Sequence, residues 1–192
     1  MPRDGELPLS RPPTDSPSGP TDEALMLAIQ AGNAAAFETL FGRYESRLYG
    51  FLVRRTGDRD AASEVFQDTF LKVFRARHTW DPSRPVKPWL FGIAVNTLKD
   101  RARRRLRRPE PVTLEEWDAP AAERSDRTDA RLALERGLSE MPDSLREAFV
   151  LGAVQGFDHN EVAATLKISP ANARARISRG RAWLRQFFAE GS

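Results

Sequence analysis

The sequence predicts an all-α protein of two small helical domains joined by a flexible linker. Three observations support this prediction. Apolar residues recur every three or four positions over most of the chain after residue 20, which is the period of an amphipathic helix. Residues 109–130 lack that period and divide the chain in two. A length of 192 residues with 40% hydrophobic content is enough for two modest cores.

Residues 1–20 are expected to form a disordered tail. They hold six of the 14 prolines, among Ser, Thr, Gly and Asp, and such a composition buries too little apolar surface to offset the entropy of ordering. The longest apolar run, 148–154, is too short to cross a bilayer, and no signal peptide is evident. We therefore expect a cytoplasmic protein.

The chain offers little for catalysis or for cofactor binding. It contains no cysteine, which excludes disulfides and thiolate metal sites. Its two histidines, His78 and His159, lie far apart without matching partners. No Walker loop, catalytic triad or metal-ligand cluster occurs in the sequence. We expect neither an enzyme nor a cofactor.

The first predicted domain spans residues 21–108. A helix from Thr21 is expected to stop at Gly32, with Asn33 capping the next helix and Asp60 capping the one after it. Both longer helices carry apolar stripes. The stripe of the earlier one comprises Phe37, Leu40, Phe41, Tyr44, Leu48, Phe51 and Leu52, and that of the later one Val65, Phe66, Phe70, Val73 and Phe74.

A loop with three prolines, residues 78–88, precedes the last predicted helix of this domain, from about Trp89 to Arg107. One face of that helix is expected to point inward through Leu90, Ile93, Ala94 and Thr97. A different face carries Asn96, Lys99, Arg103 and Arg107. Residues 96–108 hold seven basic groups against one acidic group, so this face forms a basic patch.

The linker, residues 109–130, has the opposite charge. Five acidic and no basic residues occur between Glu110 and Glu123. A solvated tether and a functional acidic strand are both compatible with this composition.

The second predicted domain spans residues 131–188. Ser144 with Glu147, and Asp158 with Glu161, have the spacing of capping boxes. Ser169 is expected to cap a last helix that begins at Pro170. A short helix, a three-residue turn and a longer helix are typical of a helix-turn-helix.

The last helix has the layout that a nucleic-acid groove requires. Ala173, Ile177, Gly180, Leu184 and Phe188 fall in one sector and are predicted to be buried, while the opposite strip consists of the small residues Ala171, Ala175, Ser178 and Ala182. Five arginines flank that strip, and no acidic residue between Ile168 and Phe188 is present to pair with them. These features favour DNA binding over a solvated basic helix.

Three stretches taken together resemble a known family. The stretch "AFETLFGRYESRLYGFLVRRTGDRDAASEVFQDTFLKVF" resembles the start of region 2, and "PWLFGIAVNTLKDRARRR" the promoter-melting end of region 2, of a bacterial RNA polymerase sigma factor. "LSEMPDSLREAFVLGAVQGFDHNEVAATLKIS", with the basic helix after it, resembles region 4. Their order and spacing match the minimal extracytoplasmic-function (ECF) group of the sigma-70 family over roughly residues 21–188.

The resemblance implies a promoter-specificity subunit that binds core RNA polymerase and promoter DNA, with an anti-sigma factor as a further partner. It places polymerase docking at Gln67 and Asp68, with Glu64 and Lys72 one turn away. It places the minus-ten contacts at Asn96, Lys99 and Arg103, and in the loop before them, where Trp80 is either a stacking platform for a base or a core aromatic. It places the minus-thirty-five contacts at Asn172, Arg174, Arg176, Ser178 and Arg179.

Two departures and one rival reading stand beside the resemblance. Lys167 occupies the turn where the family usually has Gly, and Asn172-Ala173 replaces a commoner Thr-Val pair, so the promoter sequence does not carry over. The rival is a free-standing dimeric helix-turn-helix regulator that binds a palindrome. Asn96 with its basic stripe separates the two, because a sensor or dimerisation domain does not need it.

Overall fold

The computed structural model describes residues 19–107 and 129–190. Every regular element in these two ranges is a helix, which confirms the predicted fold class. The tail predicted for residues 1–20 and the linker predicted for 109–130 lie almost entirely outside the described ranges. None of the described helices is both long enough and apolar enough to span a bilayer.

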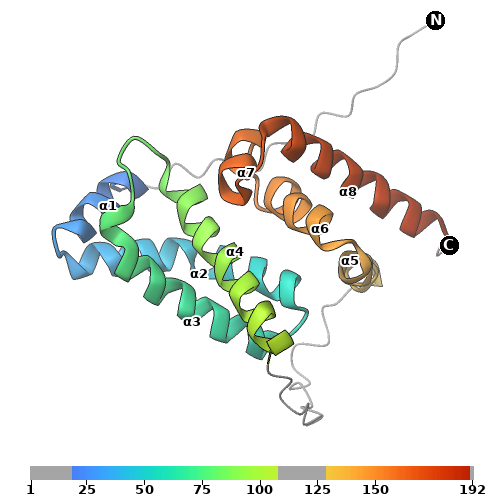
Figure 1. Cartoon of the computed structure of the whole chain (residues 1–192), viewed down its shortest axis with the longest axis horizontal. Coiled ribbons are helices and arrows are strands. Elements are labelled where there is room, and N and C mark those ends of the chain that lie inside the picture. The colour runs from blue at the N-terminus through green and yellow to red at the C-terminus, as the bar shows by residue number, and fades with distance from the viewer. Residues whose placement is uncertain (1–18, 108–128, 191–192) are drawn as a thin grey trace, which may run out of the picture.

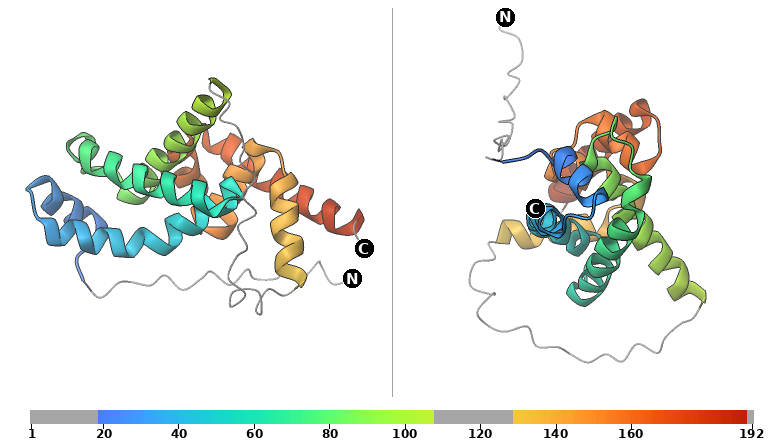
Figure 2. Two further views of the ribbon diagram at one scale, coloured as in Figure 1. Left: turned by 90° about the horizontal axis from the view of Figure 1, so that it is seen from below. Right: turned by 90° about the vertical axis from the view of Figure 1, so that its left-hand side faces the viewer.

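The first half of the structure is a bundle in which α2 and α3 run side by side and α4 crosses them (Figures 1 and 2). Its elements are α1 (Asp22–Gln30), α2 (Ala34–Thr56), α3 (Arg59–Ala76), the 3₁₀ turn η1 (Arg77–Thr79) and α4 (Val86–Arg107). Leu40, Leu48, Phe51 and Leu52 of α2 are completely buried, as their spacing predicts.

The helix ends in this half follow local capping chemistry, with two differences from the prediction. Asn33 caps α2, and its side chain accepts a hydrogen bond from the Ala36 N–H. The cap of α3 is Asp58 rather than Asp60, and its carboxylate accepts from the N–H groups of residues 60 and 61. Helix α4 begins at Val86, three residues earlier than expected, because its first N–H finds an acceptor in Glu23.

The second half contains the predicted helix-turn-helix. Its elements are α5 (Asp129–Glu140), α6 (Asp143–Phe149), the wider π-helical turn η3 (Val150–Val154), α7 (His159–Leu166) and α8 (Pro170–Glu190). The capping box of Asp158 and Glu161 is present, and Ser169 accepts from the Asn172 N–H at the start of α8. Three residues, 167–169, separate α7 from α8.

The capping box predicted for Ser144 and Glu147 does not form. Helix α6 begins two residues earlier than a Ser144 cap predicts, at Asp143, and Pro142 precedes it without a side-chain cap. Glu147 is 6% exposed. Its carboxylate lies 3.6 Å from the Lys99 ammonium of α4, so a long-range ion pair replaces the local hydrogen bond.

The two halves pack against each other, mainly through α4 and α7. The Phe91 ring of α4 lies 5.0 Å from the Phe157 ring, centroid to centroid. The Lys87 ammonium stands 3.9 Å above the same Phe157 ring and 3.4 Å from the Glu161 carboxylate. Thr165 donates a hydrogen bond to the carbonyl of Pro88. The helical periodicities do not predict this contact.

Polar contacts border the packed aromatic rings. Arg47 donates to the Gln155 carbonyl at 3.0 Å, and the Gln155 side chain donates back to the Arg47 carbonyl at 3.2 Å. Arg55 of α2 pairs with Asp143 of α6 at 3.2 Å. Arg146 and Arg55 together hold the pKa of Asp143 below its ordinary value. The contact between the halves is therefore aromatic at its centre and charged at its edge.

The close approach of α8 to α6 predicts a steric effect at Gly180. A Cβ at this position would lie 2.9 Å from the Phe149 Cβ. We expect Gly180→Ala to lower the free energy of unfolding by about 1–3 kcal/mol through overpacking. Gly42 is the matched control, because a Cβ there meets nothing within 4 Å. Gly42→Ala should stabilise by up to about 1 kcal/mol. Urea unfolding of both variants measures the difference, and equal effects would contradict the packing argument.

Candidate nucleic-acid and partner-binding surfaces

The predicted minus-ten residues of α4 share one exposed face. Asn96 and Lys99 are exposed, and the Arg103 side chain is 69% exposed. Residues three and four apart on a helix are neighbours, so these side chains form one row. Two of the three are already engaged, since Arg103 pairs with Asp100 at 3.6 Å and Lys99 with Glu147 at 3.6 Å. The row presents one carboxamide beside two cations.

Trp80 differs from the other minus-ten candidates. Its side chain is 3% exposed and belongs to the core of the first half. A base cannot stack on a ring with so little free surface, so the structure corrects the stacking role and assigns Trp80 to the core. Residues 81–85, which follow it, are all exposed.

The predicted docking residues on α3 divide into two kinds. Gln67 and Asp68 are exposed on the outer face of the helix. Glu64 pairs with Arg101, and Lys72 lies 3.3 Å from Asp100. Both of these partners belong to α4, so Glu64 and Lys72 connect the two helices while the other two side chains face solvent.

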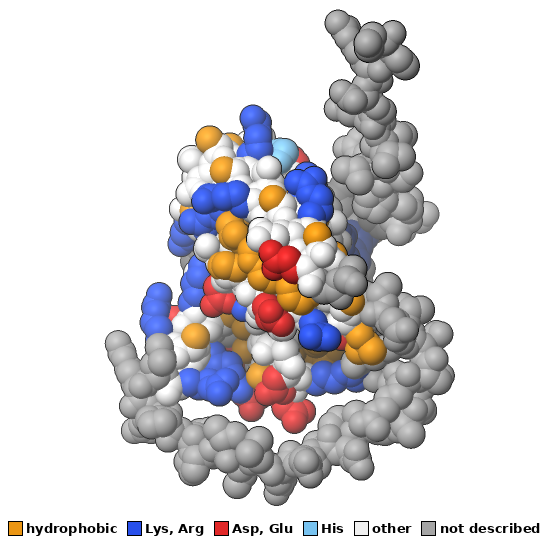
Figure 3. Space-filling model, turned by 90° about the vertical axis from the view of Figure 1, so that its right-hand side faces the viewer, with side chains coloured by type: hydrophobic (Ala, Val, Ile, Leu, Met, Phe, Trp, Pro, Cys, Tyr) orange, Lys and Arg blue, Asp and Glu red, His pale blue; other side chains and the backbone are white. Residues whose placement is uncertain are grey.

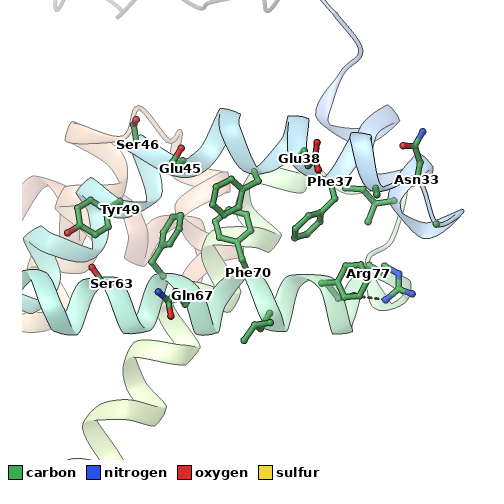
Figure 4. A pocket seen from close by; sticks show the side chains of 17 residues that line it. Asn33, Phe37, Glu38, Glu45, Ser46, Tyr49, Ser63, Gln67, Phe70 and Arg77 are labelled. Atoms are coloured by element: carbon green, nitrogen blue, oxygen red, sulfur yellow. Dashed lines mark hydrogen bonds between the residues drawn. The ribbon is translucent and has the colours of Figure 1, made fainter.

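An apolar groove of about 1070 Å³ runs between α2 and α3 beside Gln67 (Figure 4). Phe37 and Phe70 point into it, and Glu38 and Glu45 lie along its α2 edge. Its remaining aromatic lining consists of Phe41, Tyr49, Phe66 and Phe74. A contiguous exposed apolar surface marks a site for a partner.

The sequence analysis placed the five groove phenylalanines in the apolar stripes of the two helices, and the structure shows that these stripes are only partly buried. Phe74 is 47% exposed, and Leu71 beside it is 55% exposed. The Phe41 and Phe70 rings lie 4.5 Å apart and line the groove as well as the helix contact. The available signal was the high number of aromatic residues in the two predicted stripes.

Helix α8 presents the layout that its sequence predicts. Ala173, Ile177, Gly180 and Leu184 are buried, whereas Phe188 is 38% exposed because it lies in the last turns of the helix, beyond the main core. Arg174, Ser178 and Arg179 are exposed on the outer side. Asn172 and Arg176 are half-buried, and the Arg176 Nε donates to the Asn172 side chain at 3.1 Å. Three of the predicted DNA-binding residues are thus exposed, and the other two are already hydrogen-bonded to each other.

On the face of the molecule at the end that carries α5 and the C-terminus of α8, a band of apolar side chains lies among Lys and Arg side chains, with Asp and Glu side chains on and below it (Figure 3). Leu132 and Leu134 of α5 and Phe188 of α8 are the large apolar residues that this half exposes on these two helices. A second apolar surface, with charged side chains of both signs beside it, therefore lies on the half that holds the helix-turn-helix.

Comparisons with known proteins match both halves. Residues 40–108 match the family model "Sigma-70 region 2", and residues 131–184 match "Sigma-70, region 4". The chain is 35% identical over 167 residues to the RNA polymerase sigma factor CarQ of Myxococcus xanthus, with 86% of this chain and 96% of CarQ covered. It is 32% identical to the ECF RNA polymerase sigma factor SigE of Mycolicibacterium smegmatis, with 90% of this chain and 71% of SigE covered. The chain is an ECF sigma factor of the sigma-70 family.

Two solved structures resemble this sigma factor over most of its length. The structure of CnrH in complex with the cytosolic domain of CnrY has a TM-score of 0.70 and 29% identity, and covers 89% of this chain and 99% of that one. The sigma factor RpoE of Bartonella quintana, in complex with the anti-sigma factor NepR, has a TM-score of 0.67 and 22% identity. The match covers 80% of this chain and 96% of RpoE. The fold of the described residues is thus a sigma-factor fold.

The turn of the helix-turn-helix contains a residue with a strained backbone conformation. Lys167 adopts φ 55° and is the one non-glycine residue with positive φ among the described residues. Such a conformation favours Gly. We expect Lys167→Gly to raise the free energy of unfolding by about 1 kcal/mol. Ala164→Gly, at an exposed helical position in α7, should lower it by about as much. Thermal unfolding compares the two, and a loss of stability in both would refute the strain.

Proposed function

We propose that this sigma factor promotes opening of the minus-ten element through the exposed face of α4 and reads the minus-thirty-five element with α8. In this assignment, residues 21–108 bind core polymerase and the minus-ten DNA. Residues 131–188 bind the upstream element, and residues 109–130 link the two parts. The family membership supports the division, because the two family models match the chain on either side of the linker.

The observation that carries the melting role is the exposure of Asn96 in line with two cations. A carboxamide donates and accepts at once, so it suits the edge of an unpaired base. Lys99 and Arg103, one and two turns further along α4, suit the phosphates of the same strand. Helix α4 is packed along its other side, where Leu90, Phe91 and Ala94 are buried. The row of contacts is therefore held on a rigid element.

Lys99 has to change partner for this function. In the structure its ammonium lies 3.6 Å from the carboxylate of Glu147. A phosphate is an anion of similar hydrogen-bonding character, and it takes the place of that carboxylate when the strand binds. Promoter binding and the ion pair between the halves are then alternatives for one cation.

Docking on core polymerase is assigned to the outer face of α3. Gln67 and Asp68 are exposed there, and the apolar groove between α2 and α3 opens beside Gln67. An apolar groove with polar edges suits a helix from a partner protein. The related CnrH was solved with the cytosolic domain of CnrY. The sigma factor RpoE was solved with the anti-sigma factor NepR. By these two likenesses, a protein of the anti-sigma type is the further partner of this chain.

Replacing Asn96 tests the melting role. Asn96→Ala removes the base contact and should slow open-complex formation by about tenfold, the equivalent of one hydrogen bond to a base. Permanganate reactivity of unpaired thymines on duplex promoter DNA, with purified holoenzyme, measures the opening. Ala102→Ser, at an exposed position of the same helix, is the control. Opening at the wild-type rate in N96A would refute the site.

Replacing Arg174 tests the reading of the upstream element. Arg174→Ala should cost about 1–3 kcal/mol of discrimination at one base pair and relax the sequence preference there. Selection of bound sequences from a randomised upstream element by the holoenzyme reports that preference. Arg185→Ala, three turns further along α8, should weaken binding uniformly. An unchanged profile in R174A would reduce Arg174 to a phosphate contact.

Tight binding of a palindrome by a homodimer, together with failure to associate with core polymerase, would overturn the proposal as a whole. The first outcome is what a free-standing regulator predicts. The proposal predicts instead that the free chain binds DNA weakly, and that affinity arises when polymerase holds both halves at once.

A further inference from the structure

Two polar side chains of α1 reach the backbone at both ends of the loop between η1 and α4. The Gln30 side-chain amide donates to the Arg77 carbonyl at 2.7 Å and to the Trp80 carbonyl at 3.4 Å. The Glu23 carboxylate accepts from the Val86 N–H at 3.2 Å. Helix α1 precedes residues 40–108, which match the region 2 family model, so the family match does not include these ties.

The chemistry of each tie fits its place. A glutamine amide has two N–H donors, so one side chain can hold two carbonyls at a fixed separation. The first N–H groups of a helix have no partner within the helix, and Glu23 supplies one to Val86. A carboxylate at this end also interacts favourably with the dipole of α4. The entry and the exit of the loop are thereby fixed to the same helix.

The buried layer beneath the loop belongs to the same arrangement. Met26 of α1 and Val86 of α4 are completely buried, and Trp80 is 3% exposed. Trp80 and Val86 are themselves residues whose backbone groups Gln30 and Glu23 hold, and Met26 lies between Glu23 and Gln30 in α1. The backbone ties and the apolar packing therefore fix the same two points of the chain.

The exposed middle of the loop is braced from within. The Asp81 carboxylate accepts from the Ser83 N–H at 2.9 Å and from the Ser83 hydroxyl at 2.8 Å, and these bonds lower the pKa of Asp81. The Arg84 N–H donates to the Asp81 carbonyl at 2.9 Å. Residues 81–85 thus form one exposed segment with internal hydrogen bonds, and α1 holds the chain on either side of it.

We propose that Glu23 and Gln30 are positioning residues that hold loop 80–85 in the shape that receives an unpaired base of the minus-ten element. The inference rests on the melting function proposed above and on the resemblance to sigma region 2, which implies minus-ten contacts in the loop before α4 as well as on α4. Extruding a base from the duplex is costly, and a loop that must order at the same moment adds conformational entropy to that cost. A loop fixed in advance by α1 avoids the second contribution.

The variants are chosen by hydrogen-bonding capacity. Gln30→Glu keeps the size of the side chain but sets carboxylate oxygens against two carbonyl oxygens. Glu23→Ala removes the acceptor for Val86, whereas Glu23→Gln retains one and should rescue. Asp22→Asn is the matched control, because Asp22 ties the same helix to Arg43 and Tyr44 of α2 and not to the loop. Gln30→Glu and Glu23→Ala should therefore both loosen the loop and slow promoter opening. Glu23→Gln and Asp22→Asn should stay close to wild type in both measurements.

The first measurement is amide hydrogen exchange in the free full-length chain. Exchange at Val86 and across residues 80–84 should become about tenfold faster in Q30E and E23A, as expected for the loss of one hydrogen bond. It should stay near the wild-type rate in E23Q and D22N. If D22N accelerates exchange in the loop as much as the others, the effect is a general loosening of α1 and the proposal fails.

The second measurement is open-complex formation by the holoenzyme on a promoter that the wild-type holoenzyme selects from a randomised DNA library. Q30E and E23A should open duplex DNA about five- to tenfold more slowly, while binding of the upstream element stays unchanged. On the same DNA with a mismatched, already open minus-ten segment, the defect should persist, because the loop still has to order around the base. Should Q30E not fold, E23A against E23Q carries the comparison.

The two proposals fail in different ways. If the wild-type holoenzyme selects and opens no promoter, the melting function is wrong. If the wild type opens its promoter and both Q30E and E23A open it at the same rate, the melting function stands and the positioning role of α1 is wrong.

Discussion

The packing of Phe91 is the constraint on which the rest of the structure depends. Its ring is completely buried, 5.5 Å from Phe51 in the first half and 5.0 Å from Phe157 in the second. Because one side of α4 is fixed between two cores, its opposite side, which carries Asn96, has a defined direction. The proposed base contact and the contact between the halves thus lie on opposite sides of α4. A displacement of α4 at one of them also displaces the other.

Much of this architecture is encoded locally and could be predicted from the sequence. The 3.6-residue period located the long helices, and side-chain caps such as Asn33 and the Asp158 box located their starts. The predictions were wrong where a distant partner decides the outcome. Glu147 has the spacing of a capping residue but pairs with Lys99 instead. Helix α4 begins early because the Glu23 carboxylate accepts a hydrogen bond from the N–H of Val86, the first residue of α4.

The candidate sites show the same division. The buried and exposed faces of α8 follow from its pattern, since a helix that packs on one side must expose the other. Periodicity cannot say whether an aromatic residue lies deep in the core or at its edge. Trp80 was accordingly not resolved by its sequence context and is buried, whereas Phe74 reads as core and is half-exposed in the groove. Such residues are assigned only when neighbours far apart in the chain are placed.

The join between the halves has a consequence for how the protein changes shape. Around the Phe91 and Phe157 rings it includes polar contacts that water can replace, such as the reciprocal bonds of Arg47 with Gln155 and the pair of Arg55 with Asp143. Interfaces of this kind resemble those of transient complexes. Parting the halves would also expose the Phe91 and Phe157 rings to water, because both belong to one buried cluster that the two halves share, so the polar edge of the join can exchange with water more readily than its centre.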